Sequence, residues 1–432
     1  MMIDLYNLIS FPLLIIFILT SIIGFGLSIN KIFKFNILEN EIKNLFFFQG
    51  LIFIGFIFII FNIFLPISDF LSFIIILLGS VLYIFHFLKI DKKKQELIFI
   101  FSVSTISFLY SIYSGLNDDF NYHYETIKNY QNKIIFEIEH HRTISYNSHW
   151  LFLNSIFSIS IFSSSLFILT SLLFSIAVYD FYKLCNNSLK NEEYFTVVVS
   201  FFVLIFLLGV LPKYKDLGTD APGVIINIYI LIIILRHFFD KKSENFENIF
   251  LLIFLLCQFV LIIKITNSLI FLLLIFLLFK IKIKKINFLL FSLICLMPFP
   301  WIFQNYIISN CLIWPISFLC FSNTDLALNE TYLIESFAKG DITTTMELTG
   351  FSWIKVWLSN HSAKITETYG FYIFILLIPL IYSIFMKKFN SREFFRYINI
   401  KYLNLNYIII LITVLISNCI WFFFTPAYRF GI

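Results

Sequence analysis

Residues 249–279 read IFLLIFLLCQFVLIIKITNSLIFLLLIFLLF, an apolar run interrupted near its middle by Lys264-Ile-Thr-Asn267. A helix crosses a hydrocarbon core of ~30 Å with roughly 20 apolar residues, and a lysine at mid-membrane costs roughly 2.5–3.5 kcal/mol. Two readings stay open: the run breaks at Lys264 into two short spans, or Lys264 faces a polar cavity. Both place the lysine near the outer face of a membrane.

Apolar segments of this kind recur along the whole chain. The 432 residues are 59% hydrophobic and 13% charged, whereas a soluble domain has about 25% charged residues. The sequence therefore predicts an all-α polytopic membrane protein, a single integral membrane domain over residues 1–432. About twelve spans are predicted, near 7–30, 46–65, 68–88, 97–115, 150–178, 195–211, 222–238, 249–264, 266–279, 286–303, 369–386 and 404–424.

The positive charges alternate between the two ends of these spans. Loops that follow odd-numbered spans carry 21 of the 31 Lys and Arg residues, and cytoplasmic loops are the ones enriched in these residues. The odd loops are thus predicted to be cytoplasmic, with both chain termini outside, as in a bacterial inner-membrane protein whose active face is outward. The cytoplasmic anchors account for the net charge of +5, so the charge gives no reason to propose nucleic-acid binding.

Two long polar loops, 117–149 and 304–368, are predicted on the outer side. The first contains four of the seven histidines of the chain. The cytoplasmic loops are short and carry no glycine-rich phosphate loop. Group transfer on the outer face has no access to nucleotide sugars, so its donor would be carried by the membrane. The second loop holds Cys311 and Cys320, and a disulfide between them is an open alternative.

The first outer loop opens with the candidate catalytic residues Asp118, Asp119 and His123, and with Tyr122 between them. One carboxylate suits a general base toward a sugar hydroxyl, or holds a divalent cation against a phosphate. The alternative for the pair is helix capping plus a solvated charge. His123 suits a phosphate contact or proton transfer near neutral pH, or it is an interfacial histidine with a water partner.

Further basic and acidic residues are candidates for binding a phosphate. Arg binds phosphate in a bidentate manner, and a lysine offers a point charge. The competing interpretations are contact with lipid headgroups, snorkelling to the interface, and ordinary anchoring. A transporter should carry ionisable residues inside several spans. Here almost all charges lie at the ends of the predicted spans and Lys264 is the clearest charge inside one, so transport is less favoured than transfer. The candidates are His140, His141, Arg142, Lys213, Asp220, Lys264 and Arg429.

Several short motifs resemble the GT-C superfamily of membrane glycosyltransferases, and more closely a largely uncharacterised group of bacterial GT-C-like membrane proteins. They lie in the same order and on the same predicted face. The motifs are Asp118-Asp119 with Tyr122-His123, Tyr146-Asn147-Ser148-His149-Trp150, Asp220-Ala-Pro222, Asn305-Tyr306-Ile-Ile-Ser309 with Trp314-Pro315, and Arg429-Phe430-Gly431.

The resemblance implies an outward carboxylate as catalytic base, a role that falls on Asp118 or Asp119. It also implies a polyprenyl-phosphate-linked sugar as donor, with Arg429 or Lys264 as phosphate partner, and a lipid or cell-envelope glycan as acceptor. A polysaccharide polymerase or ligase is the enzymatic alternative. A flippase or transporter of lipid-linked glycans is the non-enzymatic one. No cofactor beyond an optional divalent cation is expected.

Overall fold

The computed structural model describes residues 5–33, 45–112, 123–139, 144–159, 167–191, 194–209, 217–239, 246–278, 286–339, 353–363, 366 and 416. The described residues are helical apart from connections and one isolated bridge between Cys311 and Cys320. The chain divides into two compact units, one of residues 1–314 and 318–323, the other of residues 315–317 and 324–432. The all-α prediction is confirmed for these residues.

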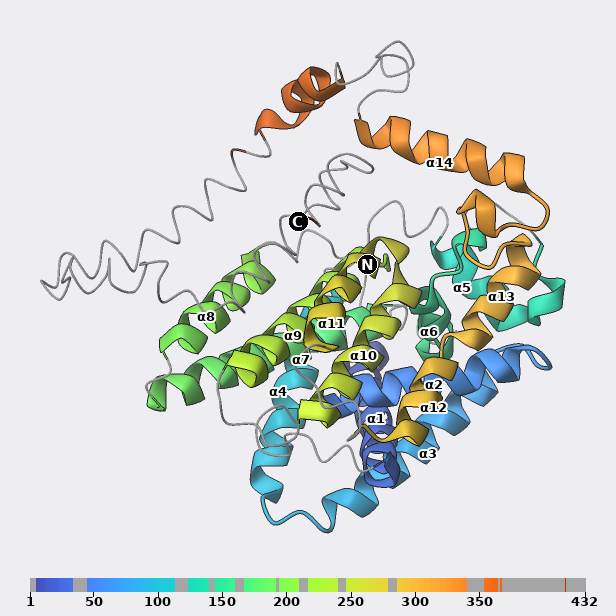
Figure 1. The fold of residues 1–432 in the computed structure, drawn as a ribbon. Helices are drawn as coiled ribbons and strands as arrows, with labels where there is room; N and C mark the ends of the chain where they lie inside the picture. The colour runs from blue at the N-terminus through green and yellow to red at the C-terminus, as the bar shows by residue number, and fades with distance from the viewer. Residues whose placement is uncertain are drawn as a thin grey trace, which may run out of the picture. The chain divides into compact units, whose positions relative to one another are not determined.

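Figure 1 labels the α-helices of the first unit, which number thirteen among the described residues. They are α1 (Leu5–Phe33), α2 (Leu45–Asn62), α3 (Asp69–Phe87), α4 (Lys93–Ile112), α5 (Tyr124–Asn132), α6 (His149–Phe157), α7 (Ile168–Lys190), α8 (Tyr194–Gly209), α9 (Asp220–Phe239), α10 (Phe246–Ile263), α11 (Phe271–Leu278), α12 (Phe288–Leu296) and α13 (Phe299–Ser309). Short 3-10 helices η2 (Ile135–Glu137), η3 (Ile144–Tyr146) and η6 (Ile265–Ile270) link some of them. Among the described residues of the second unit, α14 (Thr324–Lys339) is the longest helix, and Thr331 Oγ1 donates to the Pro315 carbonyl at 3.1 Å.

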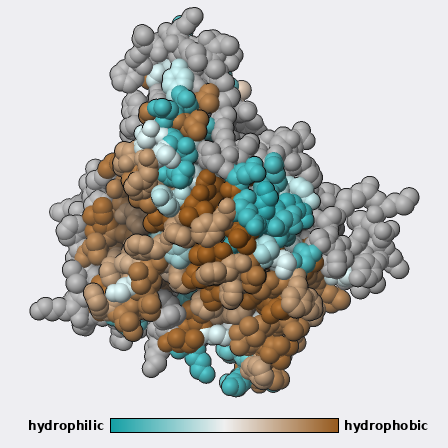
Figure 2. All heavy atoms as spheres, turned by 90° about the vertical axis from the view of Figure 1, so that its right-hand side faces the viewer, coloured by the Kyte–Doolittle hydropathy of each residue, from teal (hydrophilic) through white to brown (hydrophobic). Residues whose placement is uncertain are grey.

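Six of these segments are long and apolar enough to cross a membrane: Ser10–Ile32, Leu45–Asn62, Asp69–Phe87, Ile168–Lys190, Phe246–Ile263 and Phe288–Ser309. Hydrophobic side chains also cover much of one face of the molecule (Figure 2). Phe70, Phe73 and Phe85 of α3 and Phe288 and Leu289 of α12 are each more than half exposed, as lipid-facing side chains would be. The chain is therefore a membrane protein. The predicted spans at 369–386 and 404–424 lie almost entirely outside the described residues.

Small residues allow α1 to pack closely against α2 and α3. A Cβ added at Gly24 would lie 2.1 Å from the Gly79 carbonyl oxygen, and one at Gly50 would lie 1.9 Å from the Ile22 carbonyl oxygen. Thr20 Oγ1 and Ser80 Oγ are 3.2 Å apart between α1 and α3. Close backbone approach and hydroxyl contacts are how membrane helices associate, because lipid removes the hydrophobic drive between them.

Replacement of Gly50 by Leu is expected to destabilise the protein by about 3 kcal/mol or more, because overpacking here pushes two backbones apart rather than one flexible side chain. Thermal unfolding of the purified chain in detergent measures the effect. The matched control is Val81→Leu, which enlarges a side chain that is 39% exposed on α3. Equal unfolding temperatures for the two variants would contradict the close packing of α1 and α2.

The predicted span 150–178 is wrong, because two helices occupy that part of the chain. The nine-residue helix α6 ends at Phe157, and the candidate span is α7. Gln131 Nε2 donates to the carbonyls of Ser155 and Ser158 at 3.1 and 2.6 Å, so a side chain satisfies carbonyl groups at the end of α6. The serines of this stretch favour an ending because their hydroxyls compete for backbone hydrogen bonds.

This shift of the span corrects a second expectation, that Lys264 is the clearest charge inside a span. Asp180 lies within α7 and accepts a 2.8 Å hydrogen bond from Tyr229 Oη of α9.

The predicted span 286–303 also ends too early. Its two helices α12 and α13 meet at Pro298 and continue to Ser309, where Asn310 ends α13 with a φ of 56°. The polar segment that the sequence places at 304–368 therefore begins after Ser309.

Candidate functional site

The long apolar run breaks at Lys264, as one of the two sequence readings predicted. Helix α10 ends at Ile263, Lys264 is extended with φ −156° and ψ 121°, and the chain continues as η6 and then α11. A helix end leaves carbonyl groups without intrahelical partners, and lipid offers none. Ser148 Oγ supplies one by donating to the Ile263 carbonyl at 2.9 Å.

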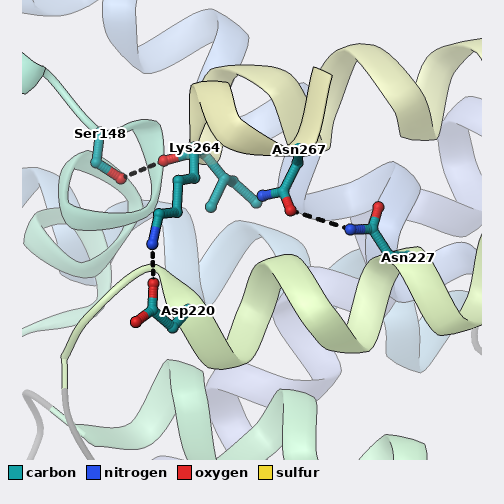
Figure 3. A network of polar contacts seen from close by, with 6 residues as sticks. Ser148, Asp220, Asn227, Lys264 and Asn267 are labelled. Carbon is teal, nitrogen blue, oxygen red and sulfur yellow. Dashed lines mark hydrogen bonds and ion pairs between the residues drawn. The ribbon is translucent and has the colours of Figure 1, made fainter. Parts of the chain in front are cut away.

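The charge of Lys264 is balanced by Asp220 from another helix. Lys264 Nζ forms an ion pair with Asp220 Oδ1, and about one fifth of each side chain is exposed (20% each) (Figure 3). Asp220 is the first residue of α9, where the helix dipole favours a negative charge. The sequence proposed both residues for phosphate binding. The structure joins them, and it gives Asp220 the role of holding the lysine.

Two asparagines extend this contact along α9. Asn227 Nδ2 donates to Asn267 Oδ1 at 3.0 Å, and Asn267 lies in η6 just past Lys264 (Figure 3). Gly223 of α9 lies beneath the Asn267 amide, because a Cβ there would approach Asn267 Nδ2 to 2.6 Å. The irregular segment after Lys264 is thus tied to α9 at two points, one ionic and one neutral.

The end of the polar segment 117–149 joins the same region. Trp150 N–H donates to Ser148 Oγ at 3.3 Å, so the hydroxyl that reaches α10 also caps α6. Asn147, with a φ of 40°, accepts at its side-chain oxygen from Tyr130 Oη at 2.6 Å and at its carbonyl from Trp301 Nε1 at 2.8 Å. The beginnings of α6 and α9, the end of α10 and one face of α13 therefore converge, although they are far apart in sequence.

His149, the first residue of α6, is almost fully buried (1% exposed). Helix α6 is not among the candidate membrane spans. Burial lowers the pKa of His149 to about 3, so its imidazole is neutral at physiological pH. The ring stacks with Phe152 and lies close to Gly55 of α2. His149 therefore contributes an uncharged imidazole ring to this region.

The structure brings only some of the predicted residues together. His123 precedes α5 and is buried (6% exposed), and Asp220 and Lys264 form the ion pair. The other candidates lie outside the described residues: Asp118, Asp119, Tyr122, His140, His141, Arg142, Lys213 and Arg429. Their predicted roles stay predictions. Within the described ranges there is no group of three or more His, Cys, Asp or Glu residues that could hold a metal ion.

Sequence reasoning missed Asn227, Asn267, Trp301 and the role of Ser148. Each is a polar or amphipathic residue within or beside an apolar span, which was the available signal. The contacts that these residues make depend on which helices are neighbours in space, and the order of residues in the sequence does not reveal this directly.

A disulfide closes the hairpin that follows α13. Cys311 and Cys320 are bonded, with their Cα atoms 3.9 Å apart. Leu312 N–H donates to the Leu319 carbonyl and Phe321 N–H to the Asn310 carbonyl, each at 2.9 Å. The open alternative for these two cysteines is thereby settled in favour of a bond. The hairpin begins directly at the end of α13, the helix that contacts Asn147.

Comparison with known proteins gives one match. No curated protein and no solved structure matches the chain. The model of one family, described as "Domain of unknown function (DUF8201)", matches residues 8–432. Because this match covers nearly the whole sequence, the chain belongs to the DUF8201 family.

Proposed function

We propose that this protein is a GT-C-type glycosyltransferase of the bacterial cytoplasmic membrane, with about twelve spans. It would transfer a sugar from a polyprenyl-phosphate-linked donor to a lipid or cell-envelope acceptor on the outer face. The observation that carries the proposal is the Lys264–Asp220 pair at a break in a candidate membrane helix. Ionisable residues within membrane segments face a bundle interior or an aqueous cavity and mark substrate sites.

Lys264 suits a phosphate whose attached chain stays in lipid. The lysine extends from a point where the backbone is already irregular, so a ligand can approach without disrupting a helix. Its charge is partly exposed, and an incoming phosphate can share it with Asp220. When no phosphate is bound, the negative charge of Asp220 neutralises Lys264. This lowers the free-energy cost of placing a lysine within the membrane.

The reaction in this proposal needs a base more than an acid. Asp119, or Asp118, takes the proton of the acceptor hydroxyl while the oxygen attacks the anomeric carbon. The bond from that carbon to the phosphate oxygen breaks, and the polyprenyl phosphate leaves with the electron pair, most simply with inversion. Phosphate is a good leaving group, so the main contribution of Lys264 is electrostatic stabilisation of the charge that develops on it.

Two independent features support an outward orientation of the site. The charge distribution places the beginnings of α6 and α9 and the end of α10 on the outer side, and the structure brings these three helix ends together. The Cys311–Cys320 disulfide follows α13, and disulfides persist in oxidising compartments such as the periplasm.

Labelling of cysteines with a maleimide–polyethylene glycol in denatured membranes is expected to add two more labels after reduction than before, because Cys311 and Cys320 are bonded. The Cys311→Ser/Cys320→Ser variant, which lacks both thiols, should show no such difference and serves as the control. Equal labelling of the native chain with and without reduction would contradict the oxidised hairpin and the orientation it supports.

A flippase or transporter of lipid-linked glycans is the second candidate, and two observations favour it. Broken helices form the substrate sites of many transporters, and α10 with η6 is such a break. Asp180 adds a carboxylate inside α7. A polysaccharide polymerase or ligase would use the same lipid carriers as the transferase.

Reconstitution in proteoliposomes with a synthetic polyprenyl-phosphate hexose tests the two candidates. A transferase releases polyprenyl phosphate and forms a new glycosidic bond when acceptor glycolipids are present. A flippase moves the lipid-linked sugar between leaflets and leaves it intact. Movement without any release of polyprenyl phosphate, across a panel of acceptors, would refute the transferase.

A further inference from the structure

Two buried amide side chains on α13 have atoms that make no hydrogen bond within the described part of the chain. Gln304 is fully buried (0% exposed), and neither its Nε2 nor its Oε1 makes a hydrogen bond in the described part of the chain. The neighbouring Asn305, 1% exposed, donates to the Leu312 carbonyl at 3.3 Å but leaves its own Oδ1 without a partner there. Buried polar groups are nearly always hydrogen-bonded, so these atoms indicate a missing partner.

The segment facing this part of α13 contributes two more such atoms. Asn147 Nδ2 and His149 Nδ1 are buried and, among the residues that the structure describes, have no hydrogen-bond partner. Trp301 Nε1 donates to the Asn147 carbonyl, and Gln304 lies three residues further along α13 on the same buried face. One turn of helix is about 5.4 Å, so Gln304 lies about one turn from the residue of α13 that contacts Asn147.

These unsatisfied groups lie beside the lysine site. Ser148, between Asn147 and His149, donates to the carbonyl of Ile263, the residue before Lys264. Ser148 therefore links the segment that holds Asn147 and His149 to the end of α10, where Lys264 follows. Asn147 and His149 thus lie next to the helix break that carries Lys264.

We infer that Asn147, His149 and Gln304 form a subsite for the ring of a neutral sugar. The unsatisfied atoms include amide donors, an amide acceptor and an imidazole nitrogen, and a hydroxyl group can serve each of them because it both donates and accepts. None of these side chains carries a charge at neutral pH, so a uronate or a second phosphate would be buried without a counter-ion. The inference rests on the proposed function, because it names the sugar class that the transferase binds.

Ligand-dependent thermal stabilisation of the full chain in detergent tests the subsite. The probes are methyl glucoside, methyl galactoside, methyl mannoside, methyl glucuronide and a polyprenyl-phosphate hexose. At least one neutral probe is expected to stabilise the protein, and methyl glucuronide is not. Gln304→Met is expected to weaken that binding about tenfold, since one or two hydrogen bonds are lost, without lowering the stability of the unliganded protein.

The matched control is Gln49→Met, which replaces another buried glutamine with an unpartnered Oε1 in the described structure. Gln49 lies near the start of α2, and Gly55, which His149 contacts, is six residues away along that helix. This variant is expected to bind the probes as the native chain does. Binding unchanged in Gln304→Met, or binding of no neutral probe, would overturn the subsite.

Lys264→Met separates the two sources of the sugar. If the subsite holds the donor sugar, this variant weakens binding of the lipid-linked hexose; if it holds an acceptor, the methyl glycoside binds independently of Lys264. Both results depend on Gln304 and support the subsite. Glycoside binding without any transfer activity would refute the proposed function and leave the subsite standing. Transfer at an unchanged rate in Gln304→Met would refute the subsite alone.

Discussion

Replacement of Lys264 by Met is expected to lower sugar transfer by about 10²–10³-fold, the usual loss when one preorganised group that stabilises developing charge is removed. The lysine is the single described cation at the helix break, and its partner is a carboxylate, so no neighbouring described charge replaces it there. Transfer from a polyprenyl-phosphate hexose in proteoliposomes, normalised to the amount of folded protein, measures the loss.

A second variant separates catalysis from folding. Breaking a buried ion pair costs about 3–5 kcal/mol because it leaves one charge unpaired, and the cost is smaller here because one fifth of each side chain is exposed. Lys264→Met alone should therefore accumulate poorly. Lys264→Met/Asp220→Asn removes both charges and should accumulate better while staying inactive. Activity near the native level in the double variant would exclude Lys264 from the phosphate site.

Replacement of both Asp118 and Asp119 by Asn is expected to abolish transfer, since a positioned general base contributes about 10²–10⁴-fold. Membrane levels of the protein should not change, because Asn keeps the shape of the side chain and its capacity to cap a helix. The single variants show which carboxylate is the base.

The matched control for the two aspartates is Asp325→Asn. Asp325 is an exposed carboxylate in the first turn of α14, and this variant should transfer normally. Full transfer by the variant that lacks both Asp118 and Asp119 would remove the catalytic base from the proposal.

The sequence predicts most of the described membrane helices because lipid imposes a simple requirement of length and hydrophobicity. The break at Lys264 is one of the two alternatives that it leaves open for the same reason, since a lysine in an apolar run conflicts with a continuous span exposed to lipid. It fails at residues 150–178, where hydrophobicity is continuous but the helix is not. The carbonyl groups at the end of α6 accept hydrogen bonds from Gln131 of α5, and a hydropathy profile does not detect such a contact.

The candidate site is predictable in part, and for a related reason. Lys264 and Asp220 stand out singly as charges at the edges of apolar spans, but 44 residues separate them, and their pairing requires α9 and η6 to be neighbours. Gln304 and Asn227 are less visible, because an uncharged amide changes the hydropathy of a span very little. Their importance appears only when burial shows which amide atoms have partners.

Native mass spectrometry of the purified chain tests most directly whether Lys264 binds the phosphate of a lipid-linked sugar. The native chain is expected to retain a polyprenyl-phosphate sugar, and its mass identifies the class of sugar. Lys264→Met/Asp220→Asn, prepared in the same way, is expected to lose it. Bulk phospholipid alone on the native chain after incubation with lipid-linked sugars, or an equal amount of the lipid-linked sugar on both proteins, would contradict the proposal.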